Sequence, residues 1–191
     1  MGSIFFTSDT HFNDPRLNIF NRPFKNMETM NRIIVKRWNS VVGKNDTVYH
    51  LGDFATNIEG YEYAKKLNGN IHLIVGNHDE PFLSKVKPYF KSISQNKIIT
   101  IKGTPYYLTH KPIDTKAHMM NLCGHIHGLW KVANKNIINV GTDAWHFYPI
   151  SENNIENQKN SIQKYYDENV FISNYFCEKN NKKTFIDDFN W

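Results

Sequence analysis

The tetrapeptide Gly76-Asn77-His78-Asp79 constrains the fold of this chain more than any other stretch. It directly follows the apolar run 71–75, which is short and rich in β-branched residues. Such a run, closed by a glycine, is typical of a buried strand. Open α/β sheets carry their chemistry at the carboxyl ends of strands, and an amide, an imidazole and a carboxylate come directly after this one. Asn and Asp also form ordinary turns, so the strength of the signal depends on the residues at the ends of the other strands.

Two earlier apolar segments end in the same kind of residue. Segment 4–8 leads into Asp9-Thr10-His11, and segment 47–51 leads into Gly52-Asp53. Helical patterns separate the three strands. The first follows Asn26, a candidate N-cap, and has Gly43 as its candidate end, and the second covers 59–67. The order strand, helix, strand, helix, strand predicts parallel strands with helical crossovers.

The second half of the chain is richer in strands. Segments 97–102 and 106–109 flank Gly103-Thr104-Pro105, which predicts a hairpin. His110 follows the hairpin, a strand then leads into Gly124-His125-Ile126-His127-Gly128, and 136–140 is a further strand. Ser151 is a candidate cap for a helix that ends near residue 169. We expect one domain over 1–191, in which 151–191 is a C-terminal helix and a loosely attached tail.

The composition indicates a globular single domain and argues against a disordered or membrane-spanning chain. The 191 residues are 40% hydrophobic and 14% aromatic, which argues against disorder. We expect no membrane span and no signal peptide, because no long apolar run is present. The two cysteines, Cys123 and Cys177, provide no disulfide framework, which favours a cytoplasmic location. The net charge of +5 suits anionic substrates, although a solvated lysine-rich surface explains it equally well.

The polar residues at the strand ends have the chemistry of metal ligands. Asp9 and His11 are two positions apart, and strand alternation would place both on one side. His125 and His127 repeat this spacing. Each pair alone is compatible with a turn or a surface position, but all the strand ends together offer ligands for two ions if one carboxylate bridges them. Nitrogen and oxygen donors without thiolate fit Mn, Fe, Zn or Ni, and we interpret Cys123 as a packing residue.

These motifs resemble those of the calcineurin-like metallophosphoesterases, in the same order and spacing over residues 4–143. The five matching blocks are Asp9-Thr10-His11, Gly52-Asp53, Gly76-Asn77-His78-Asp79, His110 and Gly124-His125-Ile126-His127. A closer likeness to small bacterial and phage members rests on Asn21-Arg22-Pro23-Phe24 and on Asn139-Val140-Gly141-Thr142-Asp143, among other stretches. The resemblance implies an α/β fold in which two β-sheets are sandwiched between helices, in four layers.

The resemblance also implies roles for single residues. One divalent ion, usually Mn, would be held by Asp9, His11 and His127, and a second by Asn77, His110 and His125. Asp53 would bridge the two ions. His78 would face the substrate phosphate and protonate the leaving oxygen, a task that suits a histidine at neutral pH.

Three further residues have two interpretations each. Asp79 would orient His78, or it would be a turn aspartate. Arg22 would contact substrate together with Asn77 and His78, or it would form a structural salt bridge. His146 would line the pocket or lie on the surface, whereas His50 and His72 are interpreted as core or edge histidines.

The expected activity is hydrolysis of a phosphoester by metal-activated hydroxide. Gly52-Asp53-Phe54-Ala55-Thr56 lacks the aspartate and arginine with which many protein phosphatases of the superfamily continue this block, so we expect a phosphodiesterase. A phosphomonoesterase, a nuclease and a non-catalytic scaffold are the alternatives. The expected substrate is small, such as a nucleotide or cyclic nucleotide. Stable nucleic-acid binding is not expected, because no stretch mixes basic and aromatic residues. Oligomeric state stays open.

Overall fold

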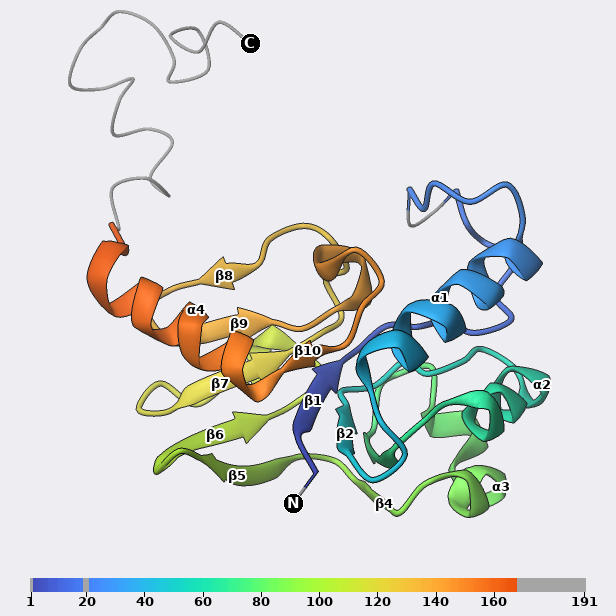
Figure 1. The fold of residues 1–191 in the computed structure, drawn as a ribbon, viewed down its shortest axis with the longest axis horizontal. Coiled ribbons are helices and arrows are strands. Elements are labelled where there is room, and N and C mark those ends of the chain that lie inside the picture. Colours follow the sequence, from blue (N-terminus) through green and yellow to red (C-terminus); the bar gives the residue numbers. More distant parts are fainter. Residues whose placement is uncertain (1, 19–20, 168–191) are drawn as a thin grey trace, which may run out of the picture.

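Two five-stranded β-sheets form the body of the protein (Figure 1). The computed structural model describes residues 2–18 and 21–167, so Cys177 and the expected tail lie outside the described residues. The strand orders are β10-β1-β2-β3-β4 and β5-β6-β7-β9-β8, and helices flank the sheets. The expected α/β arrangement of two sheets between helices is confirmed.

The first sheet contains the three strands that lead into the N-terminal motifs. β1 (Ile4–Thr7), β2 (Thr47–His50), β3 (Asn70–Ile74) and β4 (Ser92–Ser94) are parallel. β10 (Ile150–Ser151) pairs with β1 in the antiparallel direction. The parallel order predicted for the first three strands is confirmed. The sequence did not predict β4 and β10, because strands of two or three residues are too short to show alternation.

The helices of the first half differ in regularity. α1 (Met27–Val41) begins as expected at Asn26, whose side chain accepts a hydrogen bond from the Thr29 amide at 2.9 Å. It ends before Gly43, because Val42 is already extended. The single helix expected over 59–67 is instead α2 (Ile58–Tyr61) followed by a 3₁₀ helix (Glu62–Lys66). α3 (Leu83–Val86) lies between two further 3₁₀ turns, Glu80–Phe82 and Lys87–Tyr89.

The second sheet carries the C-terminal motifs. β5 (Lys97–Ile101) and β6 (Thr104–Leu108) form the predicted hairpin, with its turn at Lys102 and Gly103. β7 (Met120–Cys123) lies parallel to β6 and to β9 (Ile137–Asn139), and β8 (Val132–Ala133) pairs antiparallel with β9 at the edge. Two 3₁₀ turns, Pro112–Asp114 and Thr142–Trp145, follow β6 and β9.

Two apolar clusters hold these elements together. One joins α1 to the first sheet through Met30, Ile34 and Trp38, which are fully buried. The other joins both sheets and includes Ile155 and Ile162 of α4 (Glu152–Tyr165). Ser151 caps α4 as expected, by accepting a hydrogen bond from the Asn154 amide, and α4 ends before residue 169. No helix in the described part of the chain is long and apolar enough to cross a membrane.

Candidate metal centre

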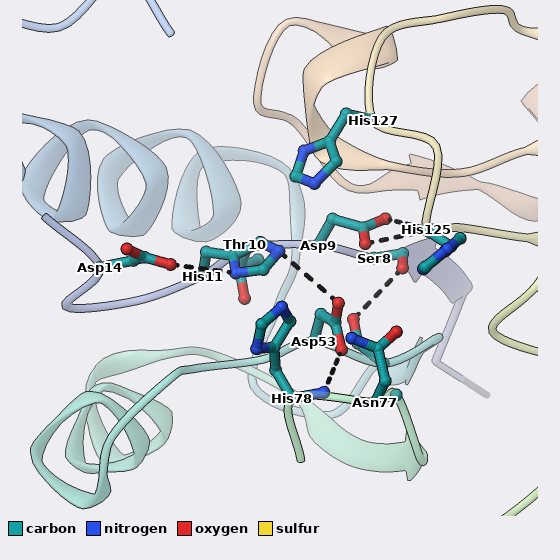
Figure 2. Close-up of polar contacts among 12 residues, drawn as sticks. Ser8, Asp9, Thr10, His11, Asp14, Asp53, Asn77, His78, His125 and His127 are labelled. Carbon is teal, nitrogen blue, oxygen red and sulfur yellow. Dashed lines mark hydrogen bonds and ion pairs between the residues drawn. The ribbon is translucent and has the colours of Figure 1, made fainter. Parts of the chain in front are cut away.

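The seven predicted metal ligands converge where the strands of both sheets end. Figure 2 labels all of them except His110. They form two groups whose potential ligand atoms lie within 4.8 Å of one another: Asp9, His11 and His127 in the first group, and Asp53, His110 and His125 in the second. Asn77 belongs with the second group, because its Oδ1 lies 3.2 Å from Nε2 of His110. Each group takes residues from both sheets.

The Asp53 carboxylate, a member of the second group, also faces the first group. Its Oδ2 is 3.7 Å from Nε2 of His11 and 3.4 Å from Nε2 of His110. Burial alone would raise the pKa of this carboxyl, but His110 and the backbone N–H of His78 hold it well below its ordinary value. Asp53 is therefore an ionised, buried carboxylate that faces ligands of both groups.

The donor atoms fit divalent transition metals. Nε2 of His110 lies 3.3 Å from Nδ1 of His125 and 3.2 Å from Oδ1 of Asn77, so two ring nitrogens and an amide oxygen converge. Imidazole and carboxylate donors without thiolate suit Mn, Fe, Zn or Ni. Although burial opposes charge, Asp53 and Asp9 raise the pKa of His110 to about 9. Binding of an ion through this imidazole therefore requires loss of a proton.

Sharp backbone turns aim the ligands at one another. Asp9, His11, Asp53, His125 and His127 have φ angles of 57°, 47°, 56°, 72° and 50°. This left-handed conformation is unfavourable for residues other than glycine and clusters at functional sites. The strand-like alternation expected for His125 and His127 is not observed. Both residues lie in the turn after β7, and they belong to different groups.

A glycine permits the second sheet to approach Asp9 closely. A Cβ atom at Gly124 would lie 2.6 Å from Oδ2 of Asp9 and would overlap the side chain of Ser8. The next residue, His125, donates its backbone N–H to the Asp9 carboxylate at 2.9 Å (Figure 2). The loop after β7 thus contacts the end of β1 directly, which fixes the Asp9 carboxylate.

Both histidines of the first group contact a carboxylate that is itself paired with an arginine. Nδ1 of His127 lies 2.8 Å from Oδ2 of Asp143, and Asp143 accepts two hydrogen bonds from Arg22, each 2.8 Å long. Nδ1 of His11 lies 3.4 Å from Oδ2 of Asp14. The two carboxylate oxygens of Asp14 accept hydrogen bonds from Arg16, of 2.9 Å at Oδ1 and 2.7 Å at Oδ2. Such outer partners orient metal-binding imidazoles and raise their basicity.

The histidines of the second group have different partners. Nδ1 of His110 lies 2.7 Å from the carbonyl oxygen of Leu51, and the His125 side chain is exposed. Asp14 and Asp143 were not identified as site residues from the sequence. Asp143 carried a signal, since it follows a predicted strand in Gly141-Thr142-Asp143, whereas Asp14 lies in an irregular loop.

The structure corrects the expectation that Arg22 contacts substrate. The side chain is buried, and besides Asp143 it donates hydrogen bonds to the carbonyl oxygens of Asp9 and Thr10. These bonds hold the backbone of the loop that carries Asp9 and His11. The salt-bridge interpretation is the one that this geometry supports.

Of the two interpretations of Asp79, the geometry favours the turn aspartate, because its carboxylate lies against backbone groups and a tyrosine hydroxyl. The buried Asp79 carboxylate accepts hydrogen bonds from the backbone N–H groups of Asp53, Phe54 and Gly76 and from the Tyr61 hydroxyl, at 2.7–3.0 Å. Burial raises its pKa to about 6. Within the described residues, Asp79 therefore ties the loops after β2 and β3 together, as a turn aspartate does.

His78 is half-buried beside the two groups. Its backbone N–H donates to Oδ1 of Asp53 at 2.9 Å, and its ring lies edge-on to that of His11 with 5.2 Å between centroids (Figure 2). The remaining histidines and Cys123 lie in core, edge or surface positions. His50 is buried against Thr10, His72 contacts Ser92 in the first sheet, and Cys123 is buried; His146 is exposed.

Comparison with known proteins agrees with this geometry. The family model of the calcineurin-like phosphoesterase superfamily domain matches residues 3–149. The chain therefore belongs to the calcineurin-like phosphoesterase superfamily.

Individual relatives come from archaea, bacteria and phage. An uncharacterized protein of Methanocaldococcus jannaschii is 36% identical over 134 residues, which cover 67% of this chain and 69% of the relative. The gene 66 protein of Mycobacterium phage L5 is 36% identical over 86 residues, 42% of each chain. The solved structure of a protein of unknown function from Aquifex aeolicus is similar with a TM-score of 0.67 and 29% identity, over 83% of this chain and 100% of that one.

Proposed function

We propose that this protein is a metal-dependent phosphodiesterase with a dinuclear centre. The observation that carries the proposal is the position of Asp53, whose Oδ2 faces His11 of the first group and His110 of the second. A carboxylate in this position could hold both of a pair of catalytic ions, which lie about 3.5–4 Å apart. Membership of a phosphoesterase superfamily supports the same chemistry.

The residues divide into ligands and a proton donor. Asp9, His11 and His127 would hold one ion, Asn77, His110 and His125 the other, and Asp53 both. When bound, two divalent ions, Mn in this proposal, polarise the phosphoryl oxygens and lower the pKa of a bound water. His78 lies beside the ligands without belonging to either group, and it would protonate the leaving oxygen.

The charge of the site favours a diester. A phosphomonoester carries close to two negative charges at neutral pH, because its second pKa is about 6, whereas a diester carries one. Arg22, the arginine that could have balanced the second charge, is engaged by Asp143. We therefore propose a small phosphodiester substrate, such as a cyclic nucleotide, and a cytoplasmic enzyme.

The test compares two chromogenic substrates after metal removal and reloading. Protein purified without chelator should contain close to two ions per chain by elemental analysis. EDTA should abolish hydrolysis and Mn should restore it. At saturating Mn and fixed pH, kcat/KM should be higher for bis-p-nitrophenyl phosphate than for p-nitrophenyl phosphate. A clear preference for the monoester would overturn the diester assignment, and metal binding without hydrolysis of either ester would indicate the scaffold alternative.

A further inference from the structure

Two hollows of unequal size lie against the two ligand groups. The large pocket, about 690 Å³, includes His127 of the first group and is otherwise lined chiefly by Pro23, Ile126, Leu129, His146 and Phe147. The small pocket, about 100 Å³, includes Asn77 and His110 of the second group. A phosphate held between the two groups would therefore have a spacious pocket on one side and a confined one on the other.

The walls of the large pocket combine apolar side chains with the polar side chains of Asn21 and Asp143, and they contain several rings. Leu129 is 76% exposed at the tip of the turn that follows His127, whereas Phe147 is only 7% exposed and lies deep in the wall. The volume lies within the range of about 300–1,000 Å³ that is typical of small-molecule sites. The exposed rings of Pro23 and His146 offer surfaces against which a flat group can pack, and the buried Phe147 ring supports this wall from below.

The wall that carries these rings is held in an unusual conformation. His146 and Phe147 have φ angles of 54° and 62°, which is rare for an aromatic residue. Arg37 donates a 2.8 Å hydrogen bond to the His146 carbonyl, and its guanidinium lies 5.7 Å from the centre of the Phe147 ring. These contacts fix a strained turn at the edge of the pocket, and strain of this kind is characteristic of ligand-binding segments.

The small pocket has the opposite character. Its lining includes Glu80, Gln95 and Lys111 in addition to the two ligands. Its volume corresponds to roughly three water molecules, at about 30 Å³ each. A polar hollow of this size suits water or a small polar group better than an apolar ring.

We propose that the site binds its diester in one direction, with a flat aromatic or heteroaromatic ester group in the large pocket and the smaller ester group toward the small pocket. This inference rests on the proposed phosphodiesterase function. It narrows the substrate class to open-chain diesters in which one ester group bears a ring, as a nucleoside does. A cyclic nucleotide, whose two ester oxygens belong to one nucleoside, does not fit this arrangement. Leu129 and His146 are then specificity residues that contact this group, and they act on its binding without contacting the metals.

Binding of phosphonates tests the large pocket without requiring that the bound compound itself be hydrolysed. We would measure the Mn-loaded protein with phenylphosphonate, cyclohexylphosphonate and methylphosphonate, by competitive inhibition of bis-p-nitrophenyl phosphate hydrolysis and by the shift in thermal midpoint. Phenylphosphonate should bind at least about 10-fold more tightly than methylphosphonate, because it buries an apolar ring. Equal binding of the three compounds, or equal binding of the phenyl and cyclohexyl compounds, would overturn the proposal.

Two substitutions in the large pocket test whether its residues cause the preference for the phenyl compound. Leu129→Ser and His146→Gly should reduce the preference for the phenyl compound about 3- to 10-fold and leave methylphosphonate binding unchanged. Glycine suits the left-handed backbone at 146, so the second variant should fold. Ile113→Ser is the matched control, because Ile113 is 88% exposed in the loop after His110 and lines neither pocket. A preference that survives both pocket variants would overturn the proposal, whereas continued hydrolysis of the diester would leave the proposed function intact.

Discussion

Nδ1 of His127 and Oδ2 of Asp143 lie 2.8 Å apart, although the two residues belong to different loops of the second sheet. The contact fixes the ring so that its other nitrogen faces the first ligand group. Burial opposes ionisation of Asp143, but His127 and Arg22 lower its pKa to about 2. Asp143 is therefore an anion at neutral pH.

Asp143→Asn should weaken metal binding at the first group. The amide keeps the shape of the carboxylate but loses its charge, so the imidazole becomes a poorer ligand and Arg22 loses its ion pair. Loss of such an outer partner typically costs about 10- to 100-fold in metal affinity. Calorimetric titration of the metal-free protein with Mn should show one of two binding steps weakened.

Asp114→Asn provides the control for this prediction. Asp114 is an exposed aspartate beside the second group's pocket, so the variant also removes one negative charge near the centre. We expect both binding steps to be retained in it. Equal weakening in the two variants would mean that net charge, rather than the contact with His127, determines affinity.

Gly124→Ala and Gly128→Ala should behave differently. A Cβ at Gly124 would collide with Ser8 and Asp9, whereas a Cβ at Gly128 would meet only Cβ of Asp143, at 3.8 Å. Overpacking of this kind typically costs about 1–3 kcal/mol. Chemical denaturation of the metal-free proteins should show Gly124→Ala destabilised and Gly128→Ala close to the parent, and Mn titration should show the same order for affinity. Equal stability of both variants would contradict the close contact at Gly124.

His78→Ala should separate catalysis from metal binding. His78 is outside both ligand groups, so elemental analysis should find an unchanged metal content. Turnover of bis-p-nitrophenyl phosphate should fall about 10²- to 10⁴-fold, as expected for loss of a general acid. Asp53→Asn is the informative comparison, since it should lower the occupancy of both ions. A variant of His78 that loses an ion would show that the residue is a ligand.

Glu156→Gln should reveal a pH-dependent contribution to stability. Glu156 on α4 accepts a 2.5 Å hydrogen bond from the Tyr106 hydroxyl and a 2.8 Å bond from Lys159. Burial opposes the charge, but these two partners lower the pKa of Glu156 below its ordinary value of 4.5. The contribution of the carboxylate is therefore fully present above that value and is lost as the pH falls below it.

The free energy of unfolding should show this dependence. At pH 7 the variant should be about 1.5–3 kcal/mol less stable than the parent, the range for hydrogen bonds to a charged group. At a pH well below 4 the difference should shrink. Urea denaturation at both pH values measures it, and Glu152→Gln is a control on the same helix. A difference that stays constant with pH would exclude the ionised carboxylate as its source.

The sequence predicted well which residues lie together at the candidate metal centre, because each follows a strand that is itself easy to recognise. Apolar runs before Asp9, Asp53 and Asn77 gave the parallel order, and this order brings the strand ends together. The hairpin before His110 had a clear turn signal in Gly103. The short strands β4, β8 and β10 gave no periodic signal, so both edges of the first sheet and the β8 edge of the second could not be predicted.

The outer contacts could not be predicted because they depend on tertiary distances. The partners Arg22 and Asp143 are separated by 121 positions, and nothing local indicates that they meet. Asp79 shows that neighbours in the sequence need not interact through their side chains. Its place next to His78 suggested a catalytic dyad, but the turn directs its carboxylate to backbone groups of the neighbouring loop.

The distribution of ligands over both sheets has a consequence for synthesis of the chain. Asp9, His11, Asp53 and Asn77 follow strands of the first sheet, but each group is completed by histidines that follow β6 and β7. A nascent chain that has not yet reached His125 lacks a complete set for either ion. In the proposed dinuclear centre, metal would therefore bind after both sheets have been synthesised, so it would stabilise the contact between the sheets and would not direct the folding of the first sheet.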